Sequence, residues 1–262
     1  MKVAATIEAR MSSSRLPGKV LMELQGAPML ARLVERVRRA KRVDEIIVAT
    51  TTNPADDPVV DLARSHGVTF FRGSEEDILD RVLHAAMTYG ADLIVELTGD
   101  NPLIEPLLID AMVAFYLDND LDYVANTAMR HTTRWEKEPT FPVGTSVEIF
   151  STELLSRVAT WTQDPLDREH VSSYIFDRPE KFRLGAFEAV DEFDACHRPD
   201  IRLTVDTDAD MRLVREIYGR LYPANPAFSL MDVVNLLTRE PDLLSINGQV
   251  IQQRVFEQRR QK

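Results

Sequence analysis

The sequence predicts an α/β fold with three layers, in which helices cover both faces of a doubly wound, mostly parallel sheet. Short apolar runs alternate with amphipathic stretches over residues 1–126, and this alternation is typical of repeated βαβ units. The apolar runs are nearly continuous, as expected for strands that are buried on both faces. A length of 262 residues suits one large domain, or a core that carries an inserted lobe.

The predicted elements follow each other in a regular order over this first part. Strands are predicted at 3–7, 44–50, 68–71, 92–97 and 122–126. Helices are predicted between them at 28–40, 57–66, 77–89 and 106–119. Gly67 and Gly90 follow two of these helices, at positions where glycine commonly ends a helix. Ligands of such sheets bind at the carboxyl ends of the strands, so functional residues are expected there.

The regular alternation stops at residue 127, and we interpret residues 127–200 as an inserted lobe with short strands of its own. The segment 129–138 is polar and irregular. A helix is predicted from Thr152, and a strand is predicted at 183–189.

The chain returns to the core after the lobe. A strand is predicted at 201–206 and a helix at 208–221. The tail at 228–262 is expected to be helical and to become polar toward its end. We therefore expect a single domain over 1–262, with the lobe set into it.

Composition limits the classes of partner. The net charge of −11 argues against a nucleic-acid partner, and no apolar run approaches the ~20 residues that span a membrane. The single cysteine, Cys196, excludes a disulfide framework within the chain. We expect a cytoplasmic protein that binds neither nucleic acid nor membranes. Basic residues gather at 10–19 and at 32–42, and the second group is expected to be a solvated helix face.

The loop after the first predicted strand contains side chains that are suited to binding a polyphosphate. Two arginines, a lysine, three serines and a glycine lie within residues 10–19. Arginine forms forked, charge-assisted hydrogen bonds to phosphate, and small residues let backbone N–H groups approach it. The spacing matches neither the Walker A loop nor the G-x-G-x-x-G loop. A solvated basic loop with a Pro-Gly turn is the alternative.

The run from Ala9 to Lys19 resembles the A-R-x-x-S-x-R-L-P-G-K signature of the sugar cytidylyltransferases, in particular the spore-coat-polysaccharide SpsF-like branch. These enzymes attach CMP from CTP to acidic sugars such as Kdo and the sialic, legionaminic and pseudaminic acids. The resemblance implies a GT-A-like Rossmann variant in which the lobe closes the acceptor site and contributes to a homodimer. It implies catalytic roles for Arg10, Arg15 and Lys19, and nucleotide contacts for Ala9, Ser13, Ser14 and Gly18.

Two aspartates fit a Mg²⁺ site. The segment Thr98-Gly99-Asp100-Asn101-Pro102 resembles the family segment whose aspartate binds Mg²⁺, and it places Thr98 at the nucleotide and Asn101 at the acceptor. Asp206 resembles the second metal ligand, although Asp208-Ala209 stands where the family has proline and glutamate. Mg²⁺ prefers oxygen ligands and is commonly held by one or two carboxylates plus phosphates. Asp100 could instead be a turn residue.

Local capping explains other acidic residues after Asp206. Thr207 and Asp210 have the spacing of a capping box. Asp208 and Asp210 are therefore expected to cap the next helix and to favour its dipole rather than to bind metal.

Two further segments resemble the SpsF-like pattern. Ser74, Asp77 and Arg81 are implied to lie near the base and ribose, although Ser74 could be a helix N-cap and Arg81 a surface residue. On the acceptor side the resemblance points to a larger set of residues, and His170 among them could accept a proton, orient the substrate or have no role. This set is Asn101, Glu148, Arg168, Glu169 and His170.

The predicted function is transfer of CMP from CTP to an acidic sugar, a nonulosonic or Kdo-like acid, with Mg²⁺ as cofactor and release of pyrophosphate, in the synthesis of a surface polysaccharide or glycan. A nucleotidyltransferase that uses another nucleoside triphosphate or a non-sugar acceptor is one alternative. A non-catalytic nucleotide-binding regulatory protein is another, from a different class. The residues predict the chemistry better than they predict the acceptor.

Overall fold

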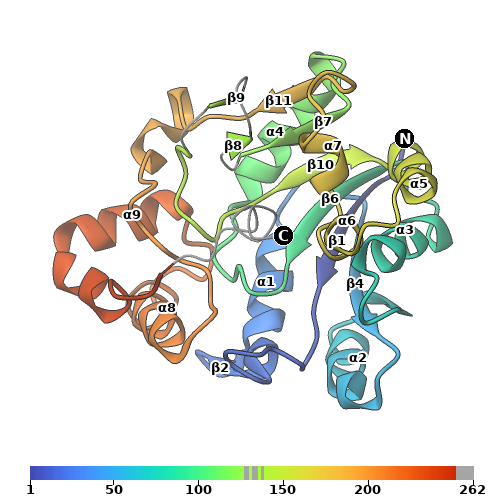
Figure 1. The fold of residues 1–262 in the computed structure, drawn as a ribbon. Helices are drawn as coiled ribbons and strands as arrows, with labels where there is room; N and C mark the ends of the chain where they lie inside the picture. The colour runs from blue at the N-terminus through green and yellow to red at the C-terminus, as the bar shows by residue number, and fades with distance from the viewer. Residues whose placement is uncertain (127–129, 132–134, 137–138, 252–262) are drawn as a thin grey trace.

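The computed structural model describes residues 1–126, 130–131, 135–136 and 139–251. A seven-stranded sheet runs through the molecule in the order β11-β7-β10-β6-β1-β4-β5 (Figure 1). Only β10 runs antiparallel to its neighbours in this sheet. The strands are β1 (Val3–Glu8), β4 (Glu45–Thr51), β5 (Thr69–Gly73), β6 (Leu93–Thr98), β7 (Tyr123–Ala125), β10 (Glu148–Ser151) and β11 (Leu184–Ala186). The predicted mostly parallel sheet is confirmed.

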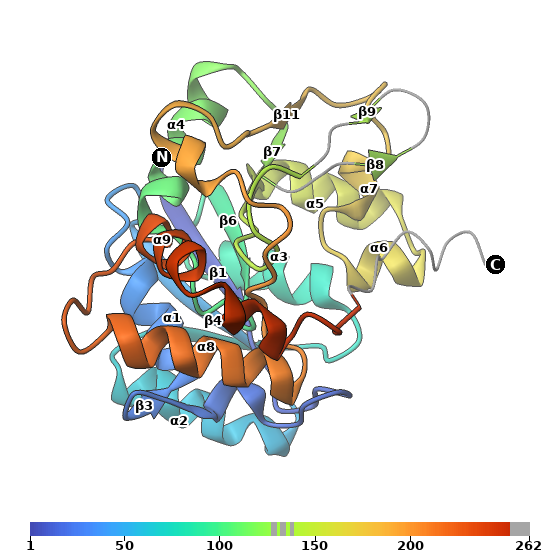
Figure 2. The same cartoon turned by 90° about the vertical axis from the view of Figure 1, so that its left-hand side faces the viewer.

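Helices cover both faces of the sheet (Figure 2). One apolar core joins a face of the sheet to α1, α2, α4, α8 and α9, and a second core joins the other face to α3, α5 and α7. The helices are α1 (Met29–Val37), α2 (Asp57–Ser65), α3 (Ile78–Thr88), α4 (Pro106–Asp118), α5 (Thr152–Trp161), α6 (Pro165–Glu169), α7 (Ser173–Phe176), α8 (Asp208–Leu221) and α9 (Leu230–Arg239). The three-layer prediction is confirmed.

Short elements connect these layers. Two small hairpins lie outside the main sheet, and the turn of the first contains Gln25 and Gly26, both with positive φ. The short elements are β2 (Glu23–Leu24), β3 (Ala27–Pro28), β8 (Arg130–His131), β9 (Trp135–Glu136) and the 3₁₀ turns η1 (Lys19–Leu21), η2 (Pro54–Asp56), η3 (Asp191–Cys196) and η4 (Pro241–Ile246). Among the described residues, no helix is both long enough and apolar enough to span a membrane.

The first strand shows how the sheet places polar groups at its carboxyl edge. Side chains two residues apart lie on the same face of a strand. Ala5 and Ile7 therefore join the core of α1 and α4, whereas Ala4 joins the core of α3 and α5. The alternation puts Thr6 and Glu8 on this second face as well, so β1 ends with a glutamate beside α3.

The predicted strand at 201–206 is wrong. This segment is extended but forms only one bridge, between Arg202 and Val143, and it joins no sheet. Its backbone groups bond to loops instead: Leu203 N donates to Val143 O at 2.7 Å, and Val205 N donates to Asp100 O at 2.9 Å. The segment therefore reaches the carboxyl edge of the sheet without being a strand of it.

Two strands from the predicted lobe, β10 and β11, are members of the main sheet. β10 lies between β6 and β7, so residues far apart in the chain pair in the sheet centre. The lobe boundaries 127–200 stay a prediction. The predicted helical tail begins with α9 and η4, and residues 252–262 lie outside the described residues.

The expectation that the basic residues at 32–42 are solvated is wrong for Arg36. This side chain is 2% exposed and lies over the Phe228 ring. Its guanidinium donates to Ile104 O at 2.7 Å and to Phe228 O at 2.9 Å, and lies 3.8 Å from the Glu105 carboxylate. Burial lowers the pKa of Arg36. The residue joins α1 to the start of α4 and to the chain before α9.

Candidate nucleotide-binding site

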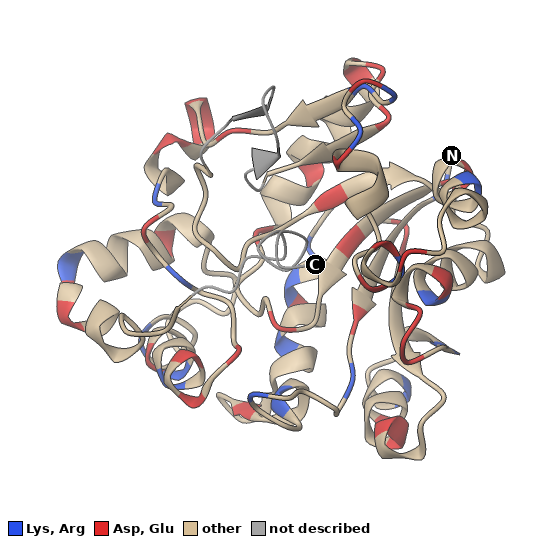
Figure 3. Cartoon of the chain, viewed as in Figure 1, with Lys and Arg blue, Asp and Glu red and all other residues tan. Residues whose placement is uncertain are grey.

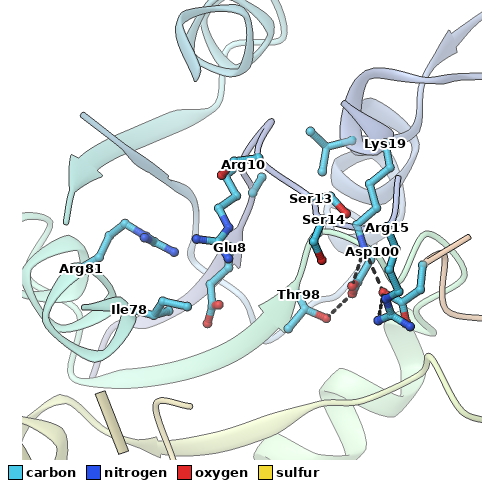
Figure 4. Close-up of a pocket in the computed structure, with 15 residues that line it drawn as sticks. Glu8, Arg10, Ser13, Ser14, Arg15, Lys19, Ile78, Arg81, Thr98 and Asp100 are labelled. Carbon is cyan, nitrogen blue, oxygen red and sulfur yellow. Dashed lines mark hydrogen bonds and ion pairs between the residues drawn. The ribbon is translucent and has the colours of Figure 1, made fainter. Parts of the chain in front are cut away.

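An open cleft of about 230 Å³ lies at the carboxyl ends of β1 and β6 (Figure 4). It contains most of the residues predicted to bind nucleotide or metal. The predicted residues that line it are Ala9, Arg10, Ser13, Ser14, Arg15, Lys19, Arg81, Thr98, Asp100 and Asp206. Lys19 meets residues 81 and 187 positions further along the chain, and this assembly agrees with the rule that parallel sheets bind ligands at this edge.

The loop between β1 and η1 is held in place by hydrogen bonds to residues that do not line the cleft. Met11 N donates to Asp56 Oδ1 at 2.6 Å, and Thr51 Oγ1 bonds to the other oxygen of this carboxylate. Gly18 has a φ of 71°, a left-handed conformation that favours glycine, and its N–H donates to Met11 O at 2.9 Å. Gly18 therefore shapes the turn that presents Lys19, and it does not itself line the cleft.

One end of the cleft, which we call the lysine end, consists of Arg15, Lys19, Asp100 and Asp206. Lys19 Nζ lies 2.9 Å from Asp100 Oδ2 and 3.1 Å from Asp206 Oδ1, and donates to Val205 O at 2.7 Å. Arg15 Nη2 lies 2.9 Å from Asp206 Oδ1. Figure 4 shows the bonds of Lys19 as dashed lines. Both aspartates are thus aimed at one cation.

Asp206 is held in place by the start of α8. Arg202 Nη2 donates to Asp206 Oδ2 at 2.8 Å, and Arg202 Nε donates to Asp210 Oδ1 at 2.9 Å. Thr207 and Asp210 form the predicted capping box. Although burial alone would raise it, Lys19 and Arg202 hold the pKa of Asp206 below its ordinary value. Asp206 is therefore a carboxylate at neutral pH.

The other end, which we call the glutamate end, consists of Glu8, Arg10, Ile78 and Arg81 (Figure 4). Arg81 is 1% exposed, so the alternative that it is a surface residue is wrong. It extends from α3, and one of its Nη atoms donates to Ser74 O. Arg10 Nη1 donates to Glu75 O at 3.3 Å. Ile78 supplies the apolar side of this end.

Ser74 and Asp77 do not line the cleft. Asp77 is the N-cap of α3 and accepts from Asp80 N at 2.9 Å, and Ser74 Oγ accepts from Asp77 N at 3.0 Å. Arg168, which was predicted at the acceptor, bonds to Asp77 Oδ2 at 2.7 Å. Ser74 and Asp77 therefore stabilise the start of α3, and the ion pair of Asp77 with Arg168 joins α3 to α6.

Three carboxyl groups from adjacent strands lie side by side behind the glutamate end. Glu96 is directly opposite Glu148 in the register of β6 and β10, and Glu96 hydrogen-bonds to Glu8. Figure 3 shows these acidic positions on β10, β6 and β1. Tyr123 Oη donates to Glu148 at 2.7 Å, and Ser172 Oγ bonds to the same oxygen.

Burial raises the pKa of all three carboxyl groups. The shift is greatest for Glu96, because the negative charges of Glu8 and Glu148 add to the effect of burial. The hydrogen bond between Glu8 and Glu96 lowers the pKa of Glu8 and raises that of Glu96. Of the two, Glu96 is therefore the residue whose protonated form is favoured more strongly.

The remaining predicted acceptor residues lie outside the cleft lining. Asn101 is buried, and its amide donates to Thr98 Oγ1 at 2.9 Å. Glu169 is exposed on α6, and His170 is the C-cap residue that follows α6. Glu148 lies behind the cleft in the carboxyl cluster. The structure thus groups most of the predicted nucleotide residues but leaves the acceptor residues spread over β10, α6 and the loop after β6.

Five residues that line the cleft were not singled out from the sequence. They are Glu8, Ser12, Val20, Ile78 and Gly99. Gly99 has a structural reason to be glycine, because an added Cβ would lie 2.6 Å from Glu8 O. The strand alternation already placed Glu8 at the end of β1 and next to the loop, so the sequence held a signal for this residue.

The donor set at the lysine end suits a divalent cation. Two carboxylates converge on one point, and Mg²⁺ prefers carboxylate and phosphate oxygens. In the part of the chain that the structure describes, no group of three or more His, Cys, Asp or Glu side chains could hold a metal alone. Phosphate oxygens and water would be able to complete the coordination of a Mg²⁺ ion held by the two aspartates.

The fold and this cleft define an α/β nucleotidyltransferase. A family model described as cytidylyltransferase matches residues 4–258, so the chain belongs to the cytidylyltransferase family. It is 33% identical to the spore coat polysaccharide biosynthesis protein SpsF of Bacillus subtilis, over 90% of this chain and 94% of that protein. It is 32% identical to a 3-deoxy-manno-octulosonate cytidylyltransferase of Anaeromyxobacter dehalogenans, over 82% and 97%.

A solved structure, that of a cytidylyltransferase from Leptospira borgpetersenii, superposes with a TM-score of 0.83 at 32% identity. The match covers 93% of this chain and 97% of that one. These similarities confirm the resemblance to the SpsF-like cytidylyltransferases that the loop sequence indicated.

Proposed function

We propose that the protein transfers CMP from CTP to an acidic sugar and releases pyrophosphate. The observation that carries this proposal is the convergence of Arg15, Lys19, Asp100 and Asp206 in one cleft beside a serine-rich loop. Positive side chains can bind the triphosphate, and two carboxylates can hold a metal beside it. The name of one relative, the 3-deoxy-manno-octulosonate cytidylyltransferase, supports a sugar-acid acceptor.

In the proposed reaction an acceptor hydroxyl attacks the α-phosphorus of CTP. A new oxygen–phosphorus bond forms, the bond to the β-phosphate oxygen breaks, and the hydroxyl proton passes to solvent. Arg10, Arg15 and Lys19 bind the β- and γ-phosphates and neutralise the charge of the departing pyrophosphate. Their contribution is positioning and electrostatic stabilisation, which dominate phosphoryl-type transfers.

We propose that Mg²⁺ is the cofactor and that Asp100 and Asp206 hold it. Bound there, the ion would neutralise phosphate charge and orient the α-phosphate for attack. Lys19 contacts both aspartates in the free protein. Nucleotide binding would therefore move the Lys19 ammonium from the carboxylates to the triphosphate and free two oxygen ligands.

The test is a pyrophosphate-release assay with Mg²⁺, in which CTP, UTP, GTP and ATP are each paired with Kdo and with sialic and legionaminic acids. Release with CTP and one of these acids is expected. Release with another nucleotide would show that the enzyme uses that nucleotide instead of CTP. Mg²⁺-dependent CTP binding without any release would favour the regulatory alternative.

Replacing Asp100 tests the metal assignment. Asp100→Asn keeps the shape of the side chain but removes a charged ligand, so turnover is expected to fall by about 100-fold or more. Asp118→Asn, at the exposed end of α4, is the matched control and should keep full activity. Unchanged Mg²⁺ dependence in Asp100→Asn would contradict the assignment.

The homodimer and the cytoplasmic location that were predicted from the sequence remain proposals, as does a role in surface polysaccharide or glycan synthesis. Light scattering coupled to size-exclusion chromatography measures the first, and cell fractionation measures the second. Loss of a surface glycan in a strain that lacks the protein would support the third.

A further inference from the structure

The two oxygens of the Asp206 carboxylate have different surroundings. Asp206 Oδ1 contacts two residues that line the cleft, at 3.1 Å from Lys19 Nζ and 2.9 Å from Arg15 Nη2. Asp206 Oδ2 accepts from Arg202 Nη2 at 2.8 Å, and Arg202 does not line the cleft. The protein therefore holds Oδ2 from behind and leaves Oδ1 as the oxygen that a ligand in the cleft can reach.

The carboxylate of Asp100 is divided in the same way. Asp100 Oδ2 lies 2.9 Å from Lys19 Nζ, and Asp100 Oδ1 accepts from Thr98 Oγ1 at 2.7 Å (Figure 4). The Asn101 amide donates to Thr98 Oγ1 at 2.9 Å, which directs the hydroxyl proton toward Asp100. Each aspartate thus has one oxygen bonded to a fixed protein donor and the other in contact with the shared ammonium of Lys19.

Arg202 is a fixed donor, because its guanidinium is held on a second carboxylate. Its Nε donates to Asp210 Oδ1 at 2.9 Å, and its Nη2 lies 3.3 Å from Asp210 Oδ2. Asp210 is fully buried. Asn247 Nδ2 donates to Asp210 Oδ1 at 2.9 Å and to Arg202 O at 3.1 Å. A planar guanidinium forked onto a buried carboxylate keeps one orientation, so Arg202 presents Nη2 to Asp206 at a set position.

Aspartates that offer one oxygen each suit one common divalent cation better than another. Mg²⁺ requires a compact octahedron and is usually held by one or two carboxylates, with phosphates and water completing its shell. Ca²⁺ takes about six to eight oxygen ligands, and carboxylates often supply both of their oxygens to it. Reserving one oxygen of each aspartate therefore disfavours Ca²⁺ more than Mg²⁺.

We propose that Arg202 and Thr98 select Mg²⁺ over Ca²⁺ at the lysine end, because each leaves one aspartate oxygen for the metal. Arg202 acts through Asp206 and Thr98 acts through Asp100, so both are positioning residues in this role. The inference rests on the proposed function, since it takes CTP with a divalent cation as the ligand. It adds Arg202, a residue that does not line the cleft.

The test measures CTP affinity and needs no acceptor. CTP is titrated calorimetrically into the wild type and Arg202→Lys, with saturating Mg²⁺, with saturating Ca²⁺ and with EDTA. The wild type should bind CTP more tightly with Mg²⁺ than with Ca²⁺. Lysine keeps a positive charge beside the buried Asp210 but lacks the fork that reaches Asp206 at the same time. The ratio of Mg²⁺-supported to Ca²⁺-supported affinity should fall about tenfold, as for other residues that orient metal ligands.

Two further variants separate this role from a structural one. Arg36→Lys makes the same exchange at another buried arginine, which donates to backbone carbonyls and does not line the cleft. It should lower the melting temperature without changing the ratio. Thr98→Val keeps the shape of the side chain and frees Asp100 Oδ1, so the ratio should again fall. Thr160→Val, at an exposed position on α5, is its control and should keep the wild-type ratio.

Thermal melting of each variant verifies that it is folded. A wild-type ratio in folded Arg202→Lys, or an equal loss of affinity with both metals, would overturn the inference. If Arg202→Lys does not fold, Thr98→Val decides, and an unchanged ratio there would overturn it. A wild type that binds CTP equally well with either metal would also overturn it and leave the proposed function intact. A wild type that binds CTP no better with Mg²⁺ than in EDTA would overturn the metal assignment, and one that does not bind CTP would overturn the proposed function.

Discussion

The lysine end and the glutamate end of the cleft solve the problem of buried charge in opposite ways. At the lysine end every charged group has an opposite partner, and Lys19 bridges two aspartates. At the glutamate end, burial raises the pKa of Glu8 and of the neighbouring Glu96 and Glu148. The first end therefore keeps Asp206 ionised by pairing it with cations, whereas the second favours the protonated form of its carboxyl groups.

This difference teaches how one site can shift the pKa values of its carboxyl groups in opposite directions. The cations beside Asp206 lower its pKa, although burial alone would raise it. Glu96 has the carboxyl groups Glu8 and Glu148 as neighbours instead, and its pKa is raised. We therefore expect the lysine end to depend on its cations and the glutamate end to depend on pH.

Replacing Lys19, whose ammonium bridges the two aspartates, should have the largest effect of the changes predicted for the two ends. Lys19→Met is expected to lower pyrophosphate release by about 100-fold or more, because a group that binds the departing phosphates is lost. It also removes the one cation that Asp100 and Asp206 share. Mg²⁺ alone should then raise the melting temperature of Lys19→Met more than that of the wild type. Equal effects of Mg²⁺ on both proteins would show that Lys19 does not compete for the metal site.

Replacing Asp210, which binds Arg202 beside Asp206, should have the next largest effect. Asp210 is fully buried and accepts from Arg202, Thr207 and Asn247. Asp210→Asn is expected to lower the free energy of unfolding by about 3 kcal/mol at pH 7, as for other broken buried ion pairs. Urea denaturation measures this value, and an exposed change such as Asp194→Asn should leave it nearly unchanged.

The pH dependence of that loss follows from the pKa of Asp210. Burial alone would raise this pKa, but the hydrogen bonds from Arg202 and Asn247 hold it below the ordinary value of 3.8. The contribution of Asp210 to stability is therefore fully present above about pH 5 and is lost as the pH falls through the lowered pKa. The difference between the wild type and Asp210→Asn should shrink at acidic pH. A constant difference from pH 7 to pH 3 would contradict this.

The smallest expected effect concerns the glutamate end. The pKa of Glu96 lies well above the ordinary 4.5, so ionisation destabilises the folded state as the pH rises above that value. Glu96→Gln cannot ionise and should raise the free energy of unfolding by about 1 kcal/mol at pH 8, with no gain at pH 4. A stability gain that is the same at both pH values would argue against a buried titrating group.

The sequence predicted the features that depend on neighbouring residues. Apolar runs, and glycines that follow helices, predicted the order of strands and helices up to residue 126. The spacing of Thr207 and Asp210 predicted the capping box. The phosphate loop was recognisable because Arg15, Lys19 and their small neighbours lie within one short segment.

The features that were missed depend on distant pairings. The sequence placed Glu8 at the end of the first strand, but its carboxyl neighbours Glu96 and Glu148 lie on β6 and β10, which come together beside it only in the folded sheet. The path of the chain before Asp206 was mistaken for a strand, since an extended apolar segment has the same local pattern whether it pairs with a sheet or with loops. Burial of Arg36 likewise depends on Phe228, nearly two hundred residues away.

The bond from Lys19 to the carbonyl of Val205 joins residues 186 positions apart, and this has a consequence for synthesis of the chain. On the ribosome, domains grow from the N-terminus, so Glu8, Arg81 and Asp100 emerge long before Asp206. A nascent chain that ends near residue 200 therefore holds the glutamate end and three of the four residues of the lysine end. Translation must reach about the last fifth of the message before the site can be completed, so a product that terminates earlier would lack the second carboxylate.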